Sequence, residues 1–427
     1  EGHDTRPDAA TADLLAEPDF VVDTAYDTTK GVVYPPPLPF DAPLVHLRAL
    51  FEVWDTSLPT ALDVLGAPAD ARREWLRLNA AERSLLTDVA FRALPELYGE
   101  PAATTLAVLN GIVGNAKTFC RRTDVTYVQL AELLRSPFVN PGSVLVPLLE
   151  ALKVSIGQIQ QRFDGTLSDG AFTDLLPDDL DPALYGGDVL VWLDANQSLI
   201  MGTITLTDLR PPGDGSHFCD FGMVELRHAL PDMTANRLTE IDHHRLLRFI
   251  RLWKKLGWSI TATDTAIAAF LGADPATLTA ATIDAAFAAM LDRLAGFLRL
   301  AAQLDLSVKK RDQWLALFDP GLDPVVRQDR LAPLLKLGTV DLDTLLDLSG
   351  IDPFADDLGS ANPSLPRLVD AAALLKGARL KVADVDFLLR HGDPTGKLTP
   401  TPAQFERDLA ALRNALTGVD TELAVPA

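Results

Sequence analysis

The stretch Leu246-Leu247-Arg248-Phe249-Ile250-Arg251-Leu252-Trp253-Lys254-Lys255-Leu256-Gly257-Trp258-Ser259-Ile260 contains a helix, a tight turn and the start of a second helix. Its apolar residues recur with the spacing of one face of an α-helix, at Leu246, Phe249, Ile250, Trp253 and Leu256. Ser259 can then cap the free N–H groups of a new helix. Trp258, just before the cap, can pack against the first turn of that helix. The stretch therefore predicts a helix-turn-helix unit.

The same turn recurs along the chain. An apolar residue precedes a small polar capping residue again at Asn79, Thr126, Ser155 and Ser307. Weaker copies over residues 337–341 and 378–382 lack such a cap, which costs about 1 kcal/mol each where nothing replaces it. The spacing is irregular: 29 residues separate Thr126 from Ser155, but 48 separate Ser259 from Ser307. Regular helical repeats keep a period of about 33–34 residues. The sequence therefore predicts a mainly α fold, an irregular array of helix-turn-helix hairpins.

The composition is that of a folded, acidic protein. Of the 427 residues, 48% are hydrophobic and 23% are charged, the balance of an ordinary globular chain. A single core rarely grows beyond about 250–300 residues, so this length predicts two or three cooperative units or a repeat array. The net charge of −21 repels phosphate backbones and anionic lipids, which disfavours nucleic-acid and membrane binding. No signal-peptide pattern and no apolar run near ~18 residues is present in the sequence.

One segment departs from the helical pattern. Residues 189–193 and 199–206 have the composition of strands separated by a turn at 194–197. After the turn-forming residues 211–215, residues 218–226 could supply a third strand. These features predict a small antiparallel β insertion.

The pattern divides the chain into four parts. We predict an extended Pro-rich arm over residues 1–40, helical parts over 41–182 and 231–427, and the β insertion over 183–230. The arm ends in Tyr34-Pro35-Pro36-Pro37-Leu38-Pro39. Such a run cannot be helical and favours an extended polyproline II conformation.

The histidines offer one candidate cluster. The chain contains His3, His46, His217, His228, His243, His244 and His391. The only cluster among them is Asp242-His243-His244. Neighbouring positions on a helix point about 100° apart, so the two imidazoles cannot both ligate one ion from a regular helix. Glu240 and His244 share a face, but the second His of the metalloprotease pattern is missing. We interpret the cluster as a solvated helix start whose carboxylates the helix dipole favours.

Two loops match ligand-binding motifs only in part. Residues 194–198 begin like a calcium loop, but Leu199 and Thr205 stand where the geometry needs Gly and Glu. The segment at 392–397, GDPTGK, has short glycine spacing for a phosphate loop, and Leu398 replaces the magnesium-binding Ser or Thr. We interpret the first segment as a turn and reject nucleotide binding at the second.

Other charged and reactive groups also have simpler interpretations. The basic stripe Arg245, Arg248, Arg251, Lys254 and Lys255 is typical of a solvated face that pairs with neighbouring helices, with an interdomain or intersubunit contact as the alternative. The acidic loop with Asp178, Asp179 and Asp181 lacks the spacing of a cation site. No sequence context activates Cys120 or Cys219, and no Gly-x-Ser-x-Gly elbow occurs. The sequence thus predicts no catalytic, cofactor-binding or metal-binding residue, and no cofactor.

Four segments, in this order, resemble the A subunits of bacterial insecticidal toxin complexes. They lie in the helical shell region, which includes the part named after a Salmonella virulence-plasmid protein. The segments are LPFDAPL at 38–44, RRTDVTY at 121–127, Cys219-Asp220 before Leu226-Arg227-His228, and the stretch from Leu246 to Trp258. The resemblance covers roughly residues 35–320.

The resemblance implies a structural role. A subunits of this family are very large pentamers that form a translocation channel inside an α-helical shell, bind target-cell surfaces and receive B and C subunits. It implies protein partners, namely further copies and other toxin subunits, together with a host-surface receptor or glycan. It implies a secreted or extracellular location and carries over no catalytic residue.

We therefore expect a non-catalytic shell segment of such a toxin, without nucleic-acid or membrane contacts of its own. The alternative is a stand-alone α-repeat adaptor or scaffold of another secretion or injection system. A glycan hydrolase is a third interpretation, because carboxylate pairs at catalytic separations are not recognisable in a sequence.

Overall fold

A computed structural model describes residues 23–210, 221–230, 232, 235–360, 362–391, 393, 396 and 398–422, without the side chains of 221 and 417–422. Over those ranges the chain forms 22 α-helices and one two-stranded antiparallel sheet. The predicted mainly α fold with a small β element is confirmed.

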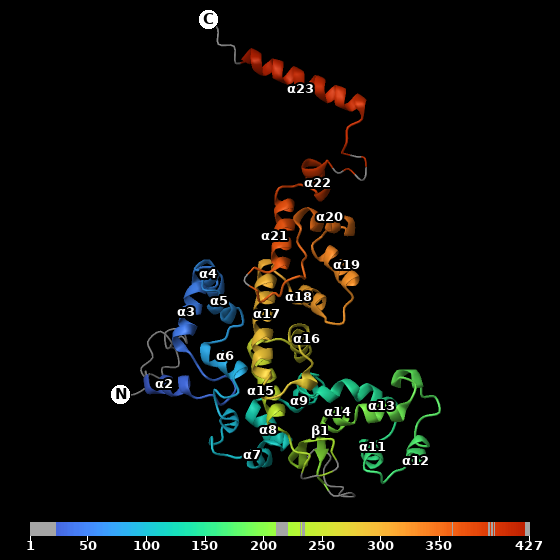
Figure 1. Cartoon of the computed structure of the whole chain (residues 1–427). Coiled ribbons are helices and arrows are strands. Elements are labelled where there is room, and N and C mark those ends of the chain that lie inside the picture. The colour runs from blue at the N-terminus through green and yellow to red at the C-terminus, as the bar shows by residue number, and fades with distance from the viewer. Residues whose placement is uncertain are drawn as a thin grey trace, which may run out of the picture. The chain divides into compact units, whose positions relative to one another are not determined.

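The chain divides into two compact units, the first ending at Pro320 and the second beginning at Gly321 (Figure 1). The predicted boundaries at 40, 182 and 230 all lie within the first unit. Its first helices are α2 (Asp23–Gly31), α3 (Ala42–Val53), α4 (Leu58–Val64), α5 (Pro68–Trp75), α6 (Ala80–Thr87), η1 (Leu94–Tyr98), α7 (Leu106–Val113), α8 (Ala116–Thr123) and α9 (Tyr127–Leu133). Next come η2 (Pro141–Leu145), α10 (Val146–Ala151), α11 (Ile156–Phe163), α12 (Asp169–Thr173), η3 (Pro182–Tyr185), α13 (Val189–Ala195) and α14 (Gln197–Met201). After the sheet follow η4 (Phe221–Met223), α15 (Glu240–Leu256), α16 (Ile260–Phe270), η5 (Pro275–Thr277), α17 (Ile283–Gln303), α18 (Val308–Leu315) and η6 (Ala316–Phe318).

The second unit contains five helices within its described residues. They are α19 (Pro324–Leu334), α20 (Thr339–Ser349), α21 (Ser364–Gly377), α22 (Val382–Arg390) and α23 (Pro402–Glu422). Leu331, Leu342 and Leu345 on α19 and α20 are buried, as are Leu365 and Leu368 on α21. These side chains share one helical face each, as expected for helices that pack through an apolar stripe.

The repeated turn has one backbone geometry. Two residues before the next helix's N-cap, the chain takes a left-handed conformation with φ between 48° and 63°, at Asp55, Arg77, Asp124, Lys153, Gly257, Asp305, Lys336 and Arg379. At six of these turns the residue after it donates a hydrogen bond five residues back, as Leu78 N does to Arg73 O (3.1 Å) and Val125 N to Cys120 O (3.0 Å). This is the Schellman ending of a helix. In this ending an apolar side chain at that position commonly contacts the last turn of the helix before it.

The predicted caps are largely confirmed. Asn79, Thr126 and Ser155 each cap a helix in a reciprocal capping box. Ser259 accepts a hydrogen bond from Ala262 N, whereas Ser307 makes no cap hydrogen bond. Of the two weaker turns, the one at Gly338 has no side-chain cap. At the other, Asp384 Oδ2 accepts from the N–H of Lys381 at 3.0 Å.

The strands predicted at 189–193 and through most of 199–206 are wrong, because that region is helical. Asp188 Oδ1 accepts from the N–H groups of Leu190 and Val191 and so starts α13. The apolar side chains then follow a helical spacing, with Val189 and Leu193 buried and Val191 exposed. The predicted turn at 194–197 is likewise the junction between α13 and α14.

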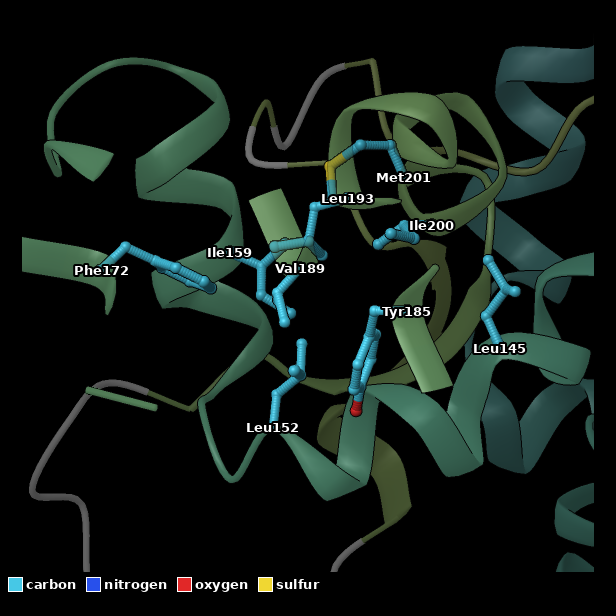
Figure 2. Close-up of a cluster of buried hydrophobic side chains, with 9 residues drawn as sticks. All are labelled: Leu145, Leu152, Ile159, Phe172, Tyr185, Val189, Leu193, Ile200 and Met201. Carbon is cyan, nitrogen blue, oxygen red and sulfur yellow. The ribbon is translucent and has the colours of Figure 1, made fainter. Parts of the chain in front are cut away.

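These helices build a separate apolar cluster. Figure 2 shows its nine buried side chains directed toward a common interior. They are Leu145, Leu152, Ile159, Phe172, Tyr185, Val189, Leu193, Ile200 and Met201. The hydroxyl of Tyr185, at the edge of this cluster, donates a hydrogen bond to Leu148 O at 2.8 Å. Burial of one face on several helices is what fixes α13 and α14 as helices.

The β element is smaller than predicted in the described ranges. Strand β1 (Ile204–Asp208) pairs antiparallel with β2 (Val224–His228), with Ile204 opposite His228. Leu226 N also donates to Gly114 O at 2.8 Å, which joins the sheet to the α7–α8 turn. Residues 211–215 and 218–220 of the predicted turn and third strand lie outside the described residues.

The Pro-rich arm is only partly extended. Residues 23–31 form helix α2, which contradicts an extended conformation there. The run from Tyr34 to Pro39 contains a turn, closed by Leu38 N donating to Pro35 O at 2.9 Å, in place of the predicted polyproline II. Residues 1–22 of the predicted arm lie outside the described residues.

Candidate functional site

Helix α15 is a buried helix with an unusually polar sequence. Eleven consecutive residues, from Asp242 to Leu252, are buried, and they include two histidines and three arginines. The helix begins at the Thr239–Asp242 capping box and ends at left-handed Gly257. It packs against α6, α16 and η1. Figure 1 shows α6 and α16 near α15. Because buried polar groups need partners, its hydrogen bonds show what each side chain does.

Both ring nitrogens of His243 take part in a chain of buried hydrogen bonds. The Tyr98 hydroxyl lies 3.0 Å from Nδ1, and Asn110 Oδ1 lies 2.9 Å from Nε2. Asn110 Nδ2 donates to Leu238 O at 2.8 Å, which fixes the orientation of the amide. Asn110 Oδ1 can only accept, so Nε2 carries the proton and Nδ1 accepts from Tyr98. Burial lowers the pKa of His243 to about 4.

Asp242 stabilises the N-terminus of α15. Its Oδ2 accepts from Thr239 N at 2.8 Å and from Thr239 Oγ1 at 2.6 Å, and it lies 2.9 Å from His228 Nε2. Burial alone would raise the pKa of Asp242, but the hydrogen bond and charge of His228 and the bonds from Thr239 outweigh it, and the pKa lies below its usual value. The carboxylate therefore joins β2 to the start of α15.

Arg251 ties the N-terminal arm to the helix. Nη2 donates to Val33 O at 2.6 Å, and Nη1 donates to Pro36 O and Leu38 O, both at 2.9 Å. The guanidinium is buried, and desolvation lowers its pKa to about 10. Asn79 adds a further bond from Nδ2 to Pro39 O at 3.0 Å. The Pro-rich run is thus held by side-chain donors, since proline itself offers no N–H.

Arg245 and Arg248 hold two other segments in the same way. Arg245 Nη2 donates to the O of Pro275, the first residue of η5, at 2.6 Å and to the O of Leu278, just after η5, at 3.0 Å. Arg248 donates to Ile283 O at 3.1 Å and forms an ion pair with Asp284 at the start of α17. Desolvation lowers the pKa of both arginines despite these partners.

The interpretation of this region as a solvated helix start and a solvated basic face is therefore wrong in its central part. His243, His244, Arg245, Arg248 and Arg251 are all buried. A guanidinium offers five donors in a plane and can satisfy several backbone carbonyls at once. Lys254 and Lys255 do pair with neighbouring helices, at Asp124 Oδ2 (2.7 Å) and Glu82 Oε1 (2.6 Å).

His244 differs from His243 in its surroundings. Its Nε2 is buried and has no hydrogen-bond partner among the described residues, and Glu240 Oε1 lies 3.6 Å away. Burial, and then the charge of Arg248, lower its pKa. Among the residues that the structure describes, no three His, Cys, Asp or Glu side chains are grouped to hold a metal ion.

A cavity of about 410 Å³ lies beside the C-terminal end of α15. Trp75 and Trp258 contribute to its wall, together with the ion pair between Arg48 Nε and Glu74 Oε2 at 2.9 Å. Ser57, also in the wall, hydrogen-bonds to Thr60 Oγ1 at 2.7 Å and not to a histidine or carboxylate. The cavity offers a mixed apolar and charged surface without an activated nucleophile in its lining.

The remaining sequence candidates lie apart from one another. Asp194 accepts from Arg162 at the end of α13, and Asp181 caps η3. Cys120 is half-buried on α8, and burial raises the pKa of its thiol. His3, His217, Cys219 and much of 392–397 lie outside the described residues.

Comparison with family models, curated proteins and solved structures finds no match to this chain. Over the described ranges, no single helix is long and apolar enough to cross a membrane. The bent helix pair Pro141–Ala151 and Ile156–Phe163 reaches that length and apolar composition only when its two helices are combined.

Proposed function

We propose that this chain is a non-catalytic structural module that binds other protein subunits, as a shell segment of a bacterial insecticidal toxin-complex A subunit. The four ordered segments that resemble this family support the assignment. In that role its partners are further copies, other toxin subunits and a receptor or glycan on the target cell. Its location is outside the bacterial cell.

One observation carries the structural part of the proposal. Large apolar side chains are exposed at the C-terminal ends of α3 and α4, with Val53 80%, Trp54 61%, Val64 83% and Leu65 77% exposed. Aromatic and aliphatic side chains presented on helices are typical of the centres of protein interfaces. Ion pairs hold this part of the chain to the rest of the unit, as between Arg299 Nε and Asp63 Oδ2 at 3.1 Å.

The use of the polar residues of α15 supports the same conclusion. Both ring nitrogens of His243 are engaged within the protein, and Arg245, Arg248 and Arg251 donate to backbone carbonyls of three different segments of the chain. Histidine and arginine side chains often bind or transform substrates in other proteins. In this chain they hold the helical hairpins together. Such an arrangement favours a rigid frame.

The mass and electron microscopy of the complete gene product test this proposal. We expect a large oligomer with this chain in its outer wall. A small monomer that binds no other subunit contradicts the proposal.

A pair of valine variants tests whether the exposed apolar surface at the ends of α3 and α4 binds another subunit. Val64→Asp places a charge where Val64 is 83% exposed, and we expect it to reduce oligomer formation. Val191→Asp on α13, where Val191 is 64% exposed, is the matched control and should assemble normally. Equal assembly of the two variants in a mass measurement would show that the α4 surface is not used.

A further inference from the structure

Helix α23 presents an apolar stripe that the described residues of its own unit leave exposed. The helix spans Pro402–Glu422, and every described side chain from 402 to 416 is exposed. Phe405, Leu409, Leu412 and Leu416 are between 39% and 57% exposed. A helix in a protein gains most of its stability from packing its apolar face. The exposed stripe therefore indicates a covering surface.

The spacing of the stripe indicates what kind of surface covers it. The four side chains are separated by four, three and four residues, which places them at d, a, d and a of a heptad. The opposite side of the helix carries Arg407 and Asn414 at the f position. A strict a/d stripe is the narrow seam of a coiled coil, whereas a helix that packs onto a globular body has a wider apolar face. The seam thus fits a second helix of the same kind.

Charge at the edges of the seam favours a second copy of this helix. Asp408 occupies a g position and Arg413 the following e position. In a parallel two-stranded coiled coil, a g residue faces the e residue five positions later on the other strand. Two identical helices in parallel therefore bring each Asp408 toward Arg413 of the other copy, twice by symmetry.

We propose that α23 pairs with α23 of a second copy in a parallel two-stranded coiled coil, with Phe405, Leu409, Leu412 and Leu416 in the seam. The pairing is short, so it forms at high protein concentration and dissociates on dilution. The proposal is independent of the toxin-shell function, because it rests only on the pattern and exposure of α23.

Sedimentation equilibrium of the full chain over a range of concentrations tests the pairing. We expect the wild-type chain to dimerise and Leu409→Asp to weaken dimerisation more than about tenfold, because it buries a charge in the seam. Ala410→Asp is the matched control, since the neighbouring residue is exposed on the same helix but lies at b, outside the seam. The control should dimerise within about twofold of the wild type.

A charge exchange tests the partner and its direction. Asp408→Arg should weaken dimerisation about fivefold, because two attractions become two repulsions, and Asp408→Arg with Arg413→Asp should restore it. A chain that is monomeric throughout, or equal effects of Leu409→Asp and Ala410→Asp, overturns the proposal. So does a dimer that Glu406→Arg weakens but Asp408→Arg does not, since that pattern indicates an antiparallel pair. Association that persists in Leu409→Asp uses another surface, which refutes this pairing and leaves the shell function standing.

Discussion

Arg251→Ala is expected to lower the free energy of unfolding of the first unit by about 3–5 kcal/mol. The guanidinium is buried and donates to the carbonyls of Val33, Pro36 and Leu38 at 2.6–2.9 Å. Truncation leaves these acceptors without their donor, and each unsatisfied buried polar group is costly. Urea unfolding followed by circular dichroism measures the loss.

Two further variants separate this effect from the loss of a charge. Arg299→Ala removes a surface ion pair with Asp63, from a side chain that is 53% exposed, and should cost less than about 1 kcal/mol. Arg251→Lys keeps the charge but offers fewer donors in a plane, so we expect an intermediate loss. In Arg251→Ala, limited proteolysis should also cut more readily between residues 23 and 40. A loss no larger than that of Arg299→Ala would contradict the role assigned to Arg251.

Acidification should destabilise the first unit through His243. The pKa of its imidazole falls from 6.5 to about 4 on folding, chiefly because of burial. The unfolded chain therefore binds more protons between these values, so the stability from the neutral imidazole is full above about pH 6.5 and is lost as pH falls toward 4. A difference of about 2.5 pKa units corresponds to roughly 3 kcal/mol. Urea unfolding at pH 7 and pH 4.5 should show about 2–3 kcal/mol of this loss.

The matched variants isolate the contribution of that histidine. His243→Gln removes the titrating group, so its stability should change less between pH 7 and pH 4.5 than that of the wild type. His46→Gln, at an exposed position on α3, should keep the wild-type pH dependence. If His243→Gln and His46→Gln lose equal stability on acidification, the buried neutral imidazole is not the cause.

The turns were predictable because their signal is local. A capping residue such as Asn79 or Ser155 and the apolar residue before it lie next to each other in the sequence. Their hydrogen bonds reach only three residues onward, to Glu82 and Gln158. Such local signals can be recognised in the sequence without knowledge of the fold.

The partners of α15 were not predictable because they come from distant parts of the chain. Arg251 meets Val33, 218 residues away, and His243 meets Asn110, 133 residues away. The sequence displays an arginine every third residue but not the carbonyls that receive them. Arg245, Arg248 and Arg251 share one face of α15 with Lys254 and Lys255, and such a basic stripe is typical of a solvated face. The sequence therefore carried no signal that the three arginines are buried.

The error at residues 189–193 has a different cause. The run VLVWL is short, apolar and rich in β-branched residues, and such a run does not separate a buried strand from a buried helix. The deciding evidence was Asp188, whose side chain accepts from the N–H groups of Leu190 and Val191. An aspartate before an apolar run is a helix-start signal that the sequence did contain.

Amide hydrogen exchange of the wild-type chain tests most directly whether α15 is the helix that holds the first unit together. We expect the amides of 246–252, all in buried residues, to exchange only through global unfolding. The amides of α3, which has no buried residue, should exchange at least about a hundredfold faster through local opening. Exchange of 246–252 at the rate of α3 would contradict the central role of α15.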